Sequence, residues 1–243
     1  MQNIYDNPEF FEGYSRMRRS VEGLAGAGEW PALRAMLPEL QGFNVLDLGC
    51  GFGWFCRWAR EQGASRVIGV DVSNNMLARA RSMTPDETIT YQQADLEQLA
   101  LPEASFDLVY SSLALHYVDD FDRLMAEVHR ALKGHGHLVF SIEHPIYMAA
   151  DRPEWLQDAK GNRVWPVNRY FVEGRRETDW LTKGVVKQHR TMGTTLNALL
   201  RLRFRLMRIE EWQPSDEQIE RWAGAEEDRE RPIFLLVAAR REP

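Results

Sequence analysis

The stretch Val45-Leu46-Asp47-Leu48-Gly49-Cys50-Gly51-Phe52-Gly53 decides how the rest of this chain is organised. An apolar strand ends there, glycine follows at every second position, and a helical pattern begins at Trp54. Glycine lets the backbone approach a ligand closely, and the free N–H groups of a helix N-terminus attract negative groups. The stretch therefore predicts a strand, a tight turn and a helix start that together cradle a ligand.

The composition is that of an ordinary globular chain. Its 243 residues, 44% of them hydrophobic, suffice for one α/β domain with a full core. A formal net charge of −6 argues against a nucleic-acid partner. No apolar run approaches the ~18 residues of a membrane span and no leader pattern opens the chain, so we expect no membrane partner and a cytoplasmic location. With only Cys50 and Cys56 available, neither a disulfide framework nor a metal site is expected.

Strands and helices alternate through the first two thirds of the chain. The patterns predict strands at 44–48, 66–70, 88–93, 106–110 and 137–142, with helices at 52–62, 74–83 and 121–132. Further helical spacing precedes the first strand, over 8–21 and 30–40. Because the strands are almost uninterrupted apolar runs, we predict an α/β fold of the doubly wound type, whose parallel sheet is covered on both faces.

The rhythm changes after His144-Pro145. Residues 145–192 form a long irregular insertion on the substrate side, with six aromatic residues, and such an insertion is usually a lid or a binding element. A helix at 194–202 and strands at 205–213 and 234–239 complete the chain. We predict a single domain, 1–243, made of an N-terminal helical cover (1–42), a ligand-binding core (43–144), the insertion (145–192) and a C-terminal helix with an edge hairpin (193–243).

The spacing around the glycine turn narrows the choice of ligand. A Walker loop would need Gly-Lys-Ser/Thr, whereas Trp54 follows Gly53. A dinucleotide fingerprint would need its third glycine at Trp54, which makes NAD a poor fit without excluding it. Asp71 ends the second predicted strand, twenty residues beyond Gly51, where a carboxylate can accept hydrogen bonds from both hydroxyls of a ribose.

Acidic residues stand near three successive strand ends. Asp47 would repel a pyrophosphate but suits an ammonium and a sulfonium, and Asp95 is placed for the exocyclic amine of adenine. Together with Asp71 these residues describe a cationic amino-acid nucleoside. At this point the chain resembles the class I S-adenosylmethionine-dependent methyltransferases. The resemblance runs from about Phe43 to Ile142 and includes Ala94-Asp95 and Phe106-Asp107-Leu108-Val109.

The resemblance implies a Rossmann-like, mostly parallel seven-stranded sheet with an antiparallel edge strand, so the strands at 205–213 and 234–239 would form a reversed edge hairpin. It also implies S-adenosyl-L-methionine as the cofactor, with Tyr14 and Arg18 folded over the methionine end. The predicted cofactor contacts are Tyr14, Arg18, Asp47, Gly49, Cys50, Gly51, Asp71, Val72, Met76, Ala94, Asp95, Leu96, Ser111 and Leu113.

Histidines are the candidates for acid–base chemistry. Methyl transfer from a sulfonium is an in-line displacement, so the protein aligns the reactants and removes a proton where the acceptor carries one. The reacting groups should lie at the carboxyl ends of the strands, which selects His116 and His144 as catalytic residues. The predicted substrate contacts are His116, Tyr117, His144, Tyr147, Tyr170 and His189.

The sequence therefore predicts a methyltransferase that acts on an oxygen, nitrogen or carbon atom of a small metabolite. The expected partners are that small-molecule acceptor and a second copy of the chain in a homodimer. Two alternatives stay open at this stage. One is a nicotinamide-dependent oxidoreductase on a similar fold, and the other is a non-catalytic protein that binds S-adenosylmethionine and serves regulation.

Overall fold

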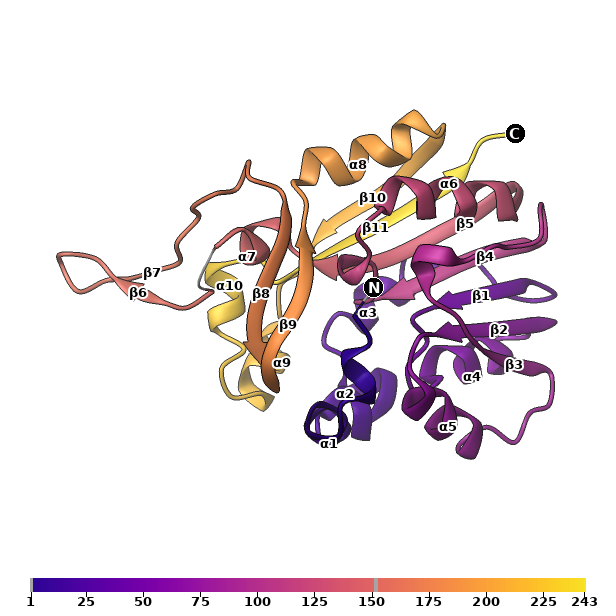
Figure 1. Cartoon of the computed structure of the whole chain (residues 1–243), viewed down its shortest axis with the longest axis horizontal. Coiled ribbons are helices and arrows are strands. Elements are labelled where there is room, and N and C mark those ends of the chain that lie inside the picture. Colours follow the sequence, from indigo (N-terminus) through magenta and orange to yellow (C-terminus); the bar gives the residue numbers. More distant parts are fainter. Residues whose placement is uncertain (1, 151–152) are drawn as a thin grey trace.

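A seven-stranded sheet forms the centre of the computed structural model, which describes residues 2–150 and 153–243 (Figure 1). Residue 1 and residues 151–152, the latter within the predicted insertion, lie outside the described residues. The strands of this sheet are β1 Asn44–Leu48, β2 Arg66–Asp71, β3 Ile89–Gln93, β4 Phe106–Ser112, β5 Leu132–Glu143, β10 Phe204–Glu211 and β11 Phe234–Arg241.

The strand order is β10-β11-β5-β4-β1-β2-β3. Neighbouring strands from β3 to β5 pair in parallel, whereas β11 runs antiparallel to both β5 and β10. The predicted reversed hairpin is therefore present at the edge of the sheet. Its edge strand is β10, and the reversed strand is β11, which lies between β10 and β5. The order reverses between β1 and β4, and the crevice at such a switch point is the usual ligand site of an open α/β sheet.

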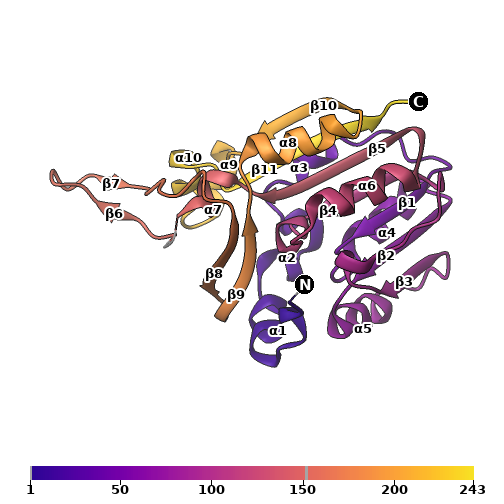
Figure 2. The same cartoon turned by 45° about the horizontal axis from the view of Figure 1, so that its top comes forward.

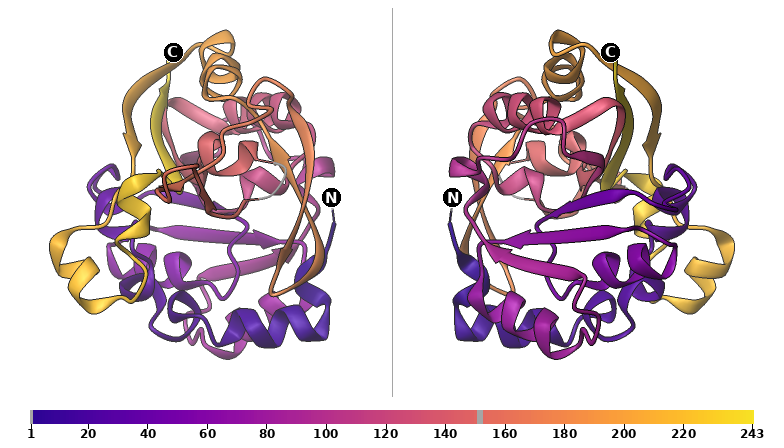
Figure 3. Two further views of the ribbon diagram at one scale, coloured as in Figure 1. Left: turned by 90° about the vertical axis from the view of Figure 1, so that its left-hand side faces the viewer. Right: turned by 90° about the vertical axis from the view of Figure 1, so that its right-hand side faces the viewer.

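Helices cover both faces of the sheet, as the two end views of Figure 3 show. The packing helices are α3 Trp30–Arg34, α4 Trp54–Glu61, α5 Asn74–Ser82, α6 Phe121–Ala131 and α8 Met192–Arg201. Side chains alternate along each strand: Val45 belongs to a core cluster that includes residues of α3, α4 and α5, whereas Leu46 belongs to a second cluster that includes residues of α6 and α8. This two-sided burial explains why the strands read as continuous apolar runs and confirms the doubly wound prediction.

The predicted irregular insertion is wrong in one respect, because about half of it forms regular secondary structure. It begins with the helix α7 Pro145–Ala149 and continues as two antiparallel hairpins. The first pairs β6 Leu156–Gln157 with β7 Arg163–Val164 and projects from the body; the second pairs β8 Gly174–Trp180 with β9 Thr182–His189 (Figures 1 and 2). Arg176, Lys187 and His189 are buried within the second hairpin, so its inward-facing residues do not read as an apolar strand pattern.

The N-terminal segment folds beside this second hairpin (Figure 2). It consists of α1 Pro8–Ser15 and α2 Arg18–Val21, and Phe10 is fully buried with its ring edge against Trp180. The side chain of Gln2 hydrogen-bonds the backbone of β9 at Gly184 and Val186. The helix predicted over 30–40 ends at Arg34, four residues before Pro38, because proline disfavours helical geometry in the residue before it.

Two short helices, α9 Asp216–Arg221 and α10 Glu227–Glu230, connect β10 to β11. Ser215 opens α9 with a reciprocal capping box to Gln218. Within the described residues, no helix has the length and apolar character needed to cross a bilayer.

Candidate active site

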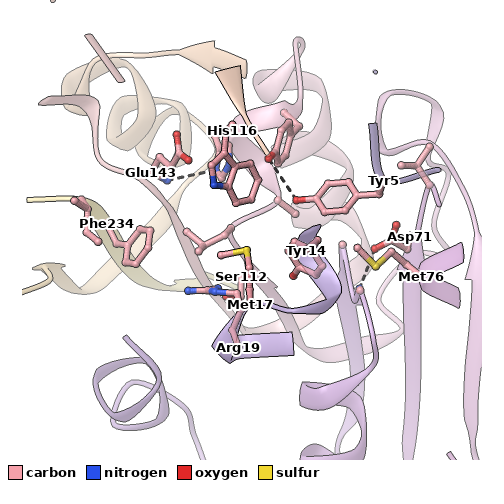
Figure 4. A pocket seen from close by; sticks show the side chains of 18 of the residues that line it. Tyr5, Tyr14, Met17, Arg19, Asp71, Met76, Ser112, His116, Glu143 and Phe234 are labelled. Atoms are coloured by element: carbon pink, nitrogen blue, oxygen red, sulfur yellow. Dashed lines mark hydrogen bonds between the residues drawn. The ribbon is translucent and has the colours of Figure 1, made fainter. Parts of the chain in front are cut away.

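A cavity of about 300 Å³ lies at the carboxyl ends of β1, β2, β4 and β5, beneath the N-terminal segment and the β8–β9 hairpin. Figure 4 shows Asp71 and Met76 at one end and Glu143 and Phe234 at the other. The residues that line this cavity are Gln2, Tyr5, Tyr14, Met17, Arg19, Gly49, Gly51, Asp71, Val72, Met76, Leu96, Ser112, Leu113, Ala114, His116, Tyr117, Glu143, Tyr147, Trp180, Asp228, Arg231, Ile233 and Phe234.

The glycine turn takes the conformation that its sequence predicts. Gly49, Gly51 and Gly53 all have positive φ angles, between 52° and 76°. A Cβ atom added to Gly49 would lie 2.3 Å from the Cβ of Ala114, whereas one added to Gly51 would enter open space. Gly49 is therefore required for packing against the loop after β4, and Gly51 keeps the cavity open.

Asp71 lies at the end of β2 and is almost fully buried. Its carboxylate accepts hydrogen bonds from the N–H groups of Gly51 and Ser73, each at 2.9 Å. Burial raises its pKa to about 6. A carboxylate offers about four acceptor positions, so two remain for a ligand, which suits a pair of neighbouring hydroxyls.

Asp47 lies deeper and lines a smaller adjoining cavity of about 90 Å³. Gly49, Gly51, Tyr14 and Arg19 line both cavities, so the glycine turn forms their common wall. Burial raises the pKa of Asp47 to about 7, and among the described residues its carboxylate accepts a hydrogen bond only from the thiol of Cys56, at 3.3 Å. This weakly partnered carboxyl group has room to bind a ligand ammonium.

Arg18 was the predicted partner of a ligand carboxylate, but the structure places its neighbour Arg19 at the cavities instead. Arg18 donates to the carbonyl of Gly26 and stacks 3.3 Å from the ring centroid of Trp222, outside both cavities. Arg19 lines both cavities and is held by the fully buried Glu29 at 3.0 Å. The break between α1 and α2 shifts the helical phase, which the sequence pattern did not reveal.

The other predicted cofactor residues divide into two groups. Tyr14, Val72, Met76, Leu96 and Leu113 line the main cavity, and Cys50 lines the smaller one.

Besides Arg18, three predicted cofactor residues do not line either cavity. Ser111 is buried and its hydroxyl donates to the carbonyl of Leu48, which ties β4 to β1; its neighbour Ser112 faces the cavity. Ala94 and Asp95 precede Leu96, and Asp95 caps the short helix Leu96–Gln98 through its carboxylate. A contact from Asp95 to adenine stays a prediction.

His116 lines the cavity, but its hydrogen bonding does not suit a general base. Its Nδ1 accepts the backbone N–H of Glu143 at 3.3 Å (Figure 4). The neutral ring then carries its proton on Nε2 and acts as a donor. Burial also lowers its pKa to about 4. This hydrogen bonding does not favour the predicted role of His116 as proton acceptor, which stays a prediction.

The structure places His144, His189 and Tyr170 away from the cavity lining. His144 caps α7 through Nδ1, which accepts from Ile146, and its Nε2 lies 2.9 Å from Glu211. The Nε2 of His189 lies 2.8 Å from the carbonyl of Tyr170. Both histidine side chains are fully buried, so the predicted catalytic role of His144 and the substrate contacts of all three residues are not supported. Tyr117 and Tyr147 do line the cavity.

Sequence reasoning also missed Glu143, at the carboxyl end of β5. One of its oxygens, Oε1, pairs with the buried ammonium of Lys187 from β9. The other, Oε2, is buried and has no hydrogen-bond partner among the described residues. A buried acceptor without a partner is costly, and such groups are frequent at ligand sites. Its position at the end of the fifth predicted strand, directly before His144, was the available signal. The sequence analysis considered only the histidine at that strand end.

A doubly wound sheet with one reversed strand, a glycine turn and acidic strand ends defines the class I methyltransferase fold. A model of the methyltransferase domain matches residues 46–140. A solved S-adenosylmethionine-dependent methyltransferase from Mesorhizobium loti is 63% identical, with 90% of this chain and 100% of that one covered and a TM-score of 0.86.

A second solved structure, of a protein from Listeria monocytogenes, is 39% identical and covers 89% of this chain and 99% of that one, with a TM-score of 0.82. The chain belongs to the S-adenosylmethionine-dependent methyltransferases and uses S-adenosylmethionine as its cofactor. The oxidoreductase alternative is not favoured.

A malonyl-[acyl-carrier protein] O-methyltransferase from Enterobacter lignolyticus is 40% identical over 128 residues. That match covers 53% of this chain and 48% of the relative, so the similarity spans about half of each protein.

The cavity residues fit the cofactor. Asp71 retains two acceptor positions for the ribose, the weakly partnered Asp47 and the ion-paired Arg19 face the region expected for the amino-acid end, and the missing Cβ of Gly51 leaves the space that a ligand would fill.

We predict that Gly51→Ala weakens binding of S-adenosylhomocysteine by about tenfold or more, because the new methyl group enters the cavity. Gly42→Ala is the matched control, since Gly42 also has a positive φ and open space at its Cβ but lies outside the cavity. Both variants should lose about 1–2 kcal/mol of unfolding free energy. Calorimetric titration and thermal unfolding measure the two effects, and equal affinity in both variants would contradict this placement.

Cofactor affinity should rise with pH. The pKa values of about 6 and about 7 leave Asp71 and Asp47 largely protonated in acid, and only their ionised forms attract a cationic ligand. We expect S-adenosylmethionine to bind roughly tenfold or more tightly at about pH 8 than at about pH 5.5, and Asp47→Asn to flatten the dependence. Titrations across this range check the sign, and an affinity that falls with rising pH would refute it.

Proposed function

We propose that this chain transfers the methyl group of S-adenosylmethionine to an oxygen, nitrogen or carbon atom of a small organic acceptor. The observation that carries the proposal is the two-ended cavity: its second end, formed by residues such as His116, Glu143 and Phe234, lies beyond the glycine turn and can hold a second molecule. Tyr5, Tyr14 and Trp180 also line the cavity, and their aromatic rings suit an organic ligand with few polar groups.

The bound cofactor supplies an electrophilic methyl group on a positively charged sulfur. The protein's part is to align the acceptor and, where the acceptor atom carries a proton, to receive it. We assign that proton to Oε2 of Glu143, because this oxygen is the unpartnered acceptor at the second end of the cavity. Lys187 holds the other oxygen and so fixes the orientation of the carboxylate. His116 then positions the acceptor by donating from Nε2.

A carboxylate oxygen is a second candidate for the acceptor atom, and it would need no base. The similarity to a malonyl-[acyl-carrier protein] O-methyltransferase favours it, over about half the length of each protein. The homodimer stays a prediction.

For an acceptor that carries a proton, Glu143→Gln should lower turnover by about hundredfold and leave the affinity for S-adenosylhomocysteine unchanged. Glu177→Gln is the matched control, because Glu177 is an exposed residue of β8 paired with Arg175. His116→Gln should mainly raise the KM of the acceptor. Transfer of a labelled methyl group into metabolites of a cell extract, followed by isolation of the product, provides the assay. Full turnover in Glu143→Gln together with a strong loss of kcat in His116→Gln would restore the histidine as the base.

A further inference from the structure

An arginine enclosed by aromatic rings stands at the second end of the cavity. Arg231 precedes β11 and lines the cavity, although nine tenths of its side chain is buried. Its guanidinium carbon lies 4.1 Å from the ring centroid of Trp165, 4.9 Å from that of Tyr147 and 5.2 Å from that of Trp155. We call these three rings the arginine cage. The cage comes from the insertion, whereas its arginine comes from the segment before the last strand.

The arginine cage is a built feature, because each of its tryptophans is tied to the rest of the protein. Trp155 donates from its indole nitrogen to Glu227 at 2.9 Å, and Trp165 donates to the carbonyl of Ile146 at 3.3 Å. Tyr147 stacks on Trp165 with only 8° between the ring planes. The position of the guanidinium is thus fixed by packing.

The cage stabilises the charge of Arg231 without consuming its hydrogen-bond donors. A ring face attracts a cation through its quadrupole, so the N–H groups stay available for other partners. Within the described residues, the one hydrogen bond that Arg231 makes is a single long contact of 3.3 Å to Asp228, and its Nε is buried without a partner. An arginine fork can bind a carboxylate through two parallel hydrogen bonds, which the contact with Asp228 does not achieve.

We propose that Arg231 anchors a carboxylate group of the methyl acceptor, and that this subsite selects organic acids as substrates. The proposal rests on the proposed function for the location of the acceptor. A single guanidinium matches the single charge of a carboxylate. A phosphate dianion would meet stronger repulsion from Asp228 and Glu143, which line the same cavity.

The anchored carboxylate is distinct from the reacting atom. Three strand spacings separate β11 from β1, where the glycine turn begins, which amounts to about 14 Å. The acceptor atom must lie near the glycine turn to meet the methyl group, so the acceptor spans the cavity with its carboxylate at Arg231. An acceptor whose only carboxylate is the methylated group does not fit this subsite.

Four probes of one shape test the charge preference: phenylacetate, phenylacetamide, phenethylammonium and phenyl phosphate. Each is titrated into the full chain with and without S-adenosylhomocysteine, and the fluorescence of the indole rings, two of which contact Arg231, reports binding. We expect phenylacetate to bind about tenfold or more tightly than neutral phenylacetamide. Equal binding of these two, or tighter binding of phenethylammonium or phenyl phosphate, would overturn the proposal.

Arg231→Met should abolish the preference for phenylacetate over phenylacetamide, and Arg231→Lys, which keeps the charge but lacks the fork, should reduce it. Arg221→Met is the matched control, because Arg221 is exposed on α9 and does not line the cavity. Thermal unfolding verifies that the variants fold. If Arg231→Met does not fold, Arg231→Lys alone decides the test. A preference unchanged in both Arg231 variants would refute the role. If S-adenosylhomocysteine itself does not bind, the proposed function fails, while the titrations without it still test the arginine.

Discussion

The close packing of the glycine turn against the loop after β4 is the constraint on which the site depends. No side chain fits at Gly49, because a Cβ would lie 2.3 Å from that of Ala114. Leu113, next to Ala114, takes a left-handed conformation at φ 53° and donates its N–H to the carbonyl of Ser141 on β5. Such strain in a non-glycine residue persists only where its surroundings enforce it, so β1, β4 and β5 hold the floor of the cavity in one fixed shape.

Buried charges are distributed around this floor in pairs. Arg19 pairs with Glu29, Lys187 with Glu143 and Arg231 with Asp228, and of these six residues only Glu143 belongs to a central parallel strand. Burying an ion costs free energy that a partner must offset. Among the described residues, Asp71 and Asp47 have no such basic partner, and burial raises the pKa of both. The two adjoining cavities thus each contain an acidic group that a cationic ligand can pair with.

The sequence predicted the central fold and most of the cofactor end because these depend on local patterns. The apolar strand runs, the glycine spacing and the place of Asp71 at a strand end can each be recognised from a few neighbouring residues in the sequence. The acceptor end depends on long-range contacts: Lys187 reaches Glu143 across 44 positions, and Arg231 meets Tyr147, Trp155 and Trp165 from far along the chain. The histidines misled the prediction because residue type gives no information on which ring nitrogen is already bonded. The sequence could not show that Arg19 rather than Arg18 lines the cavities, because adjacent helical residues face different directions and the helix begins at that point.

The most direct measurement is a crystal structure of the protein with S-adenosylhomocysteine. The account predicts that both ribose hydroxyls donate to Asp71, that the homocysteine carboxylate lies beside Arg19, and that the sulfur faces the half of the cavity lined by His116 and Glu143. A ribose bound away from Asp71, or a sulfur shielded from Glu143 by protein, would contradict the assignment of this cavity as the place where the methyl group is transferred.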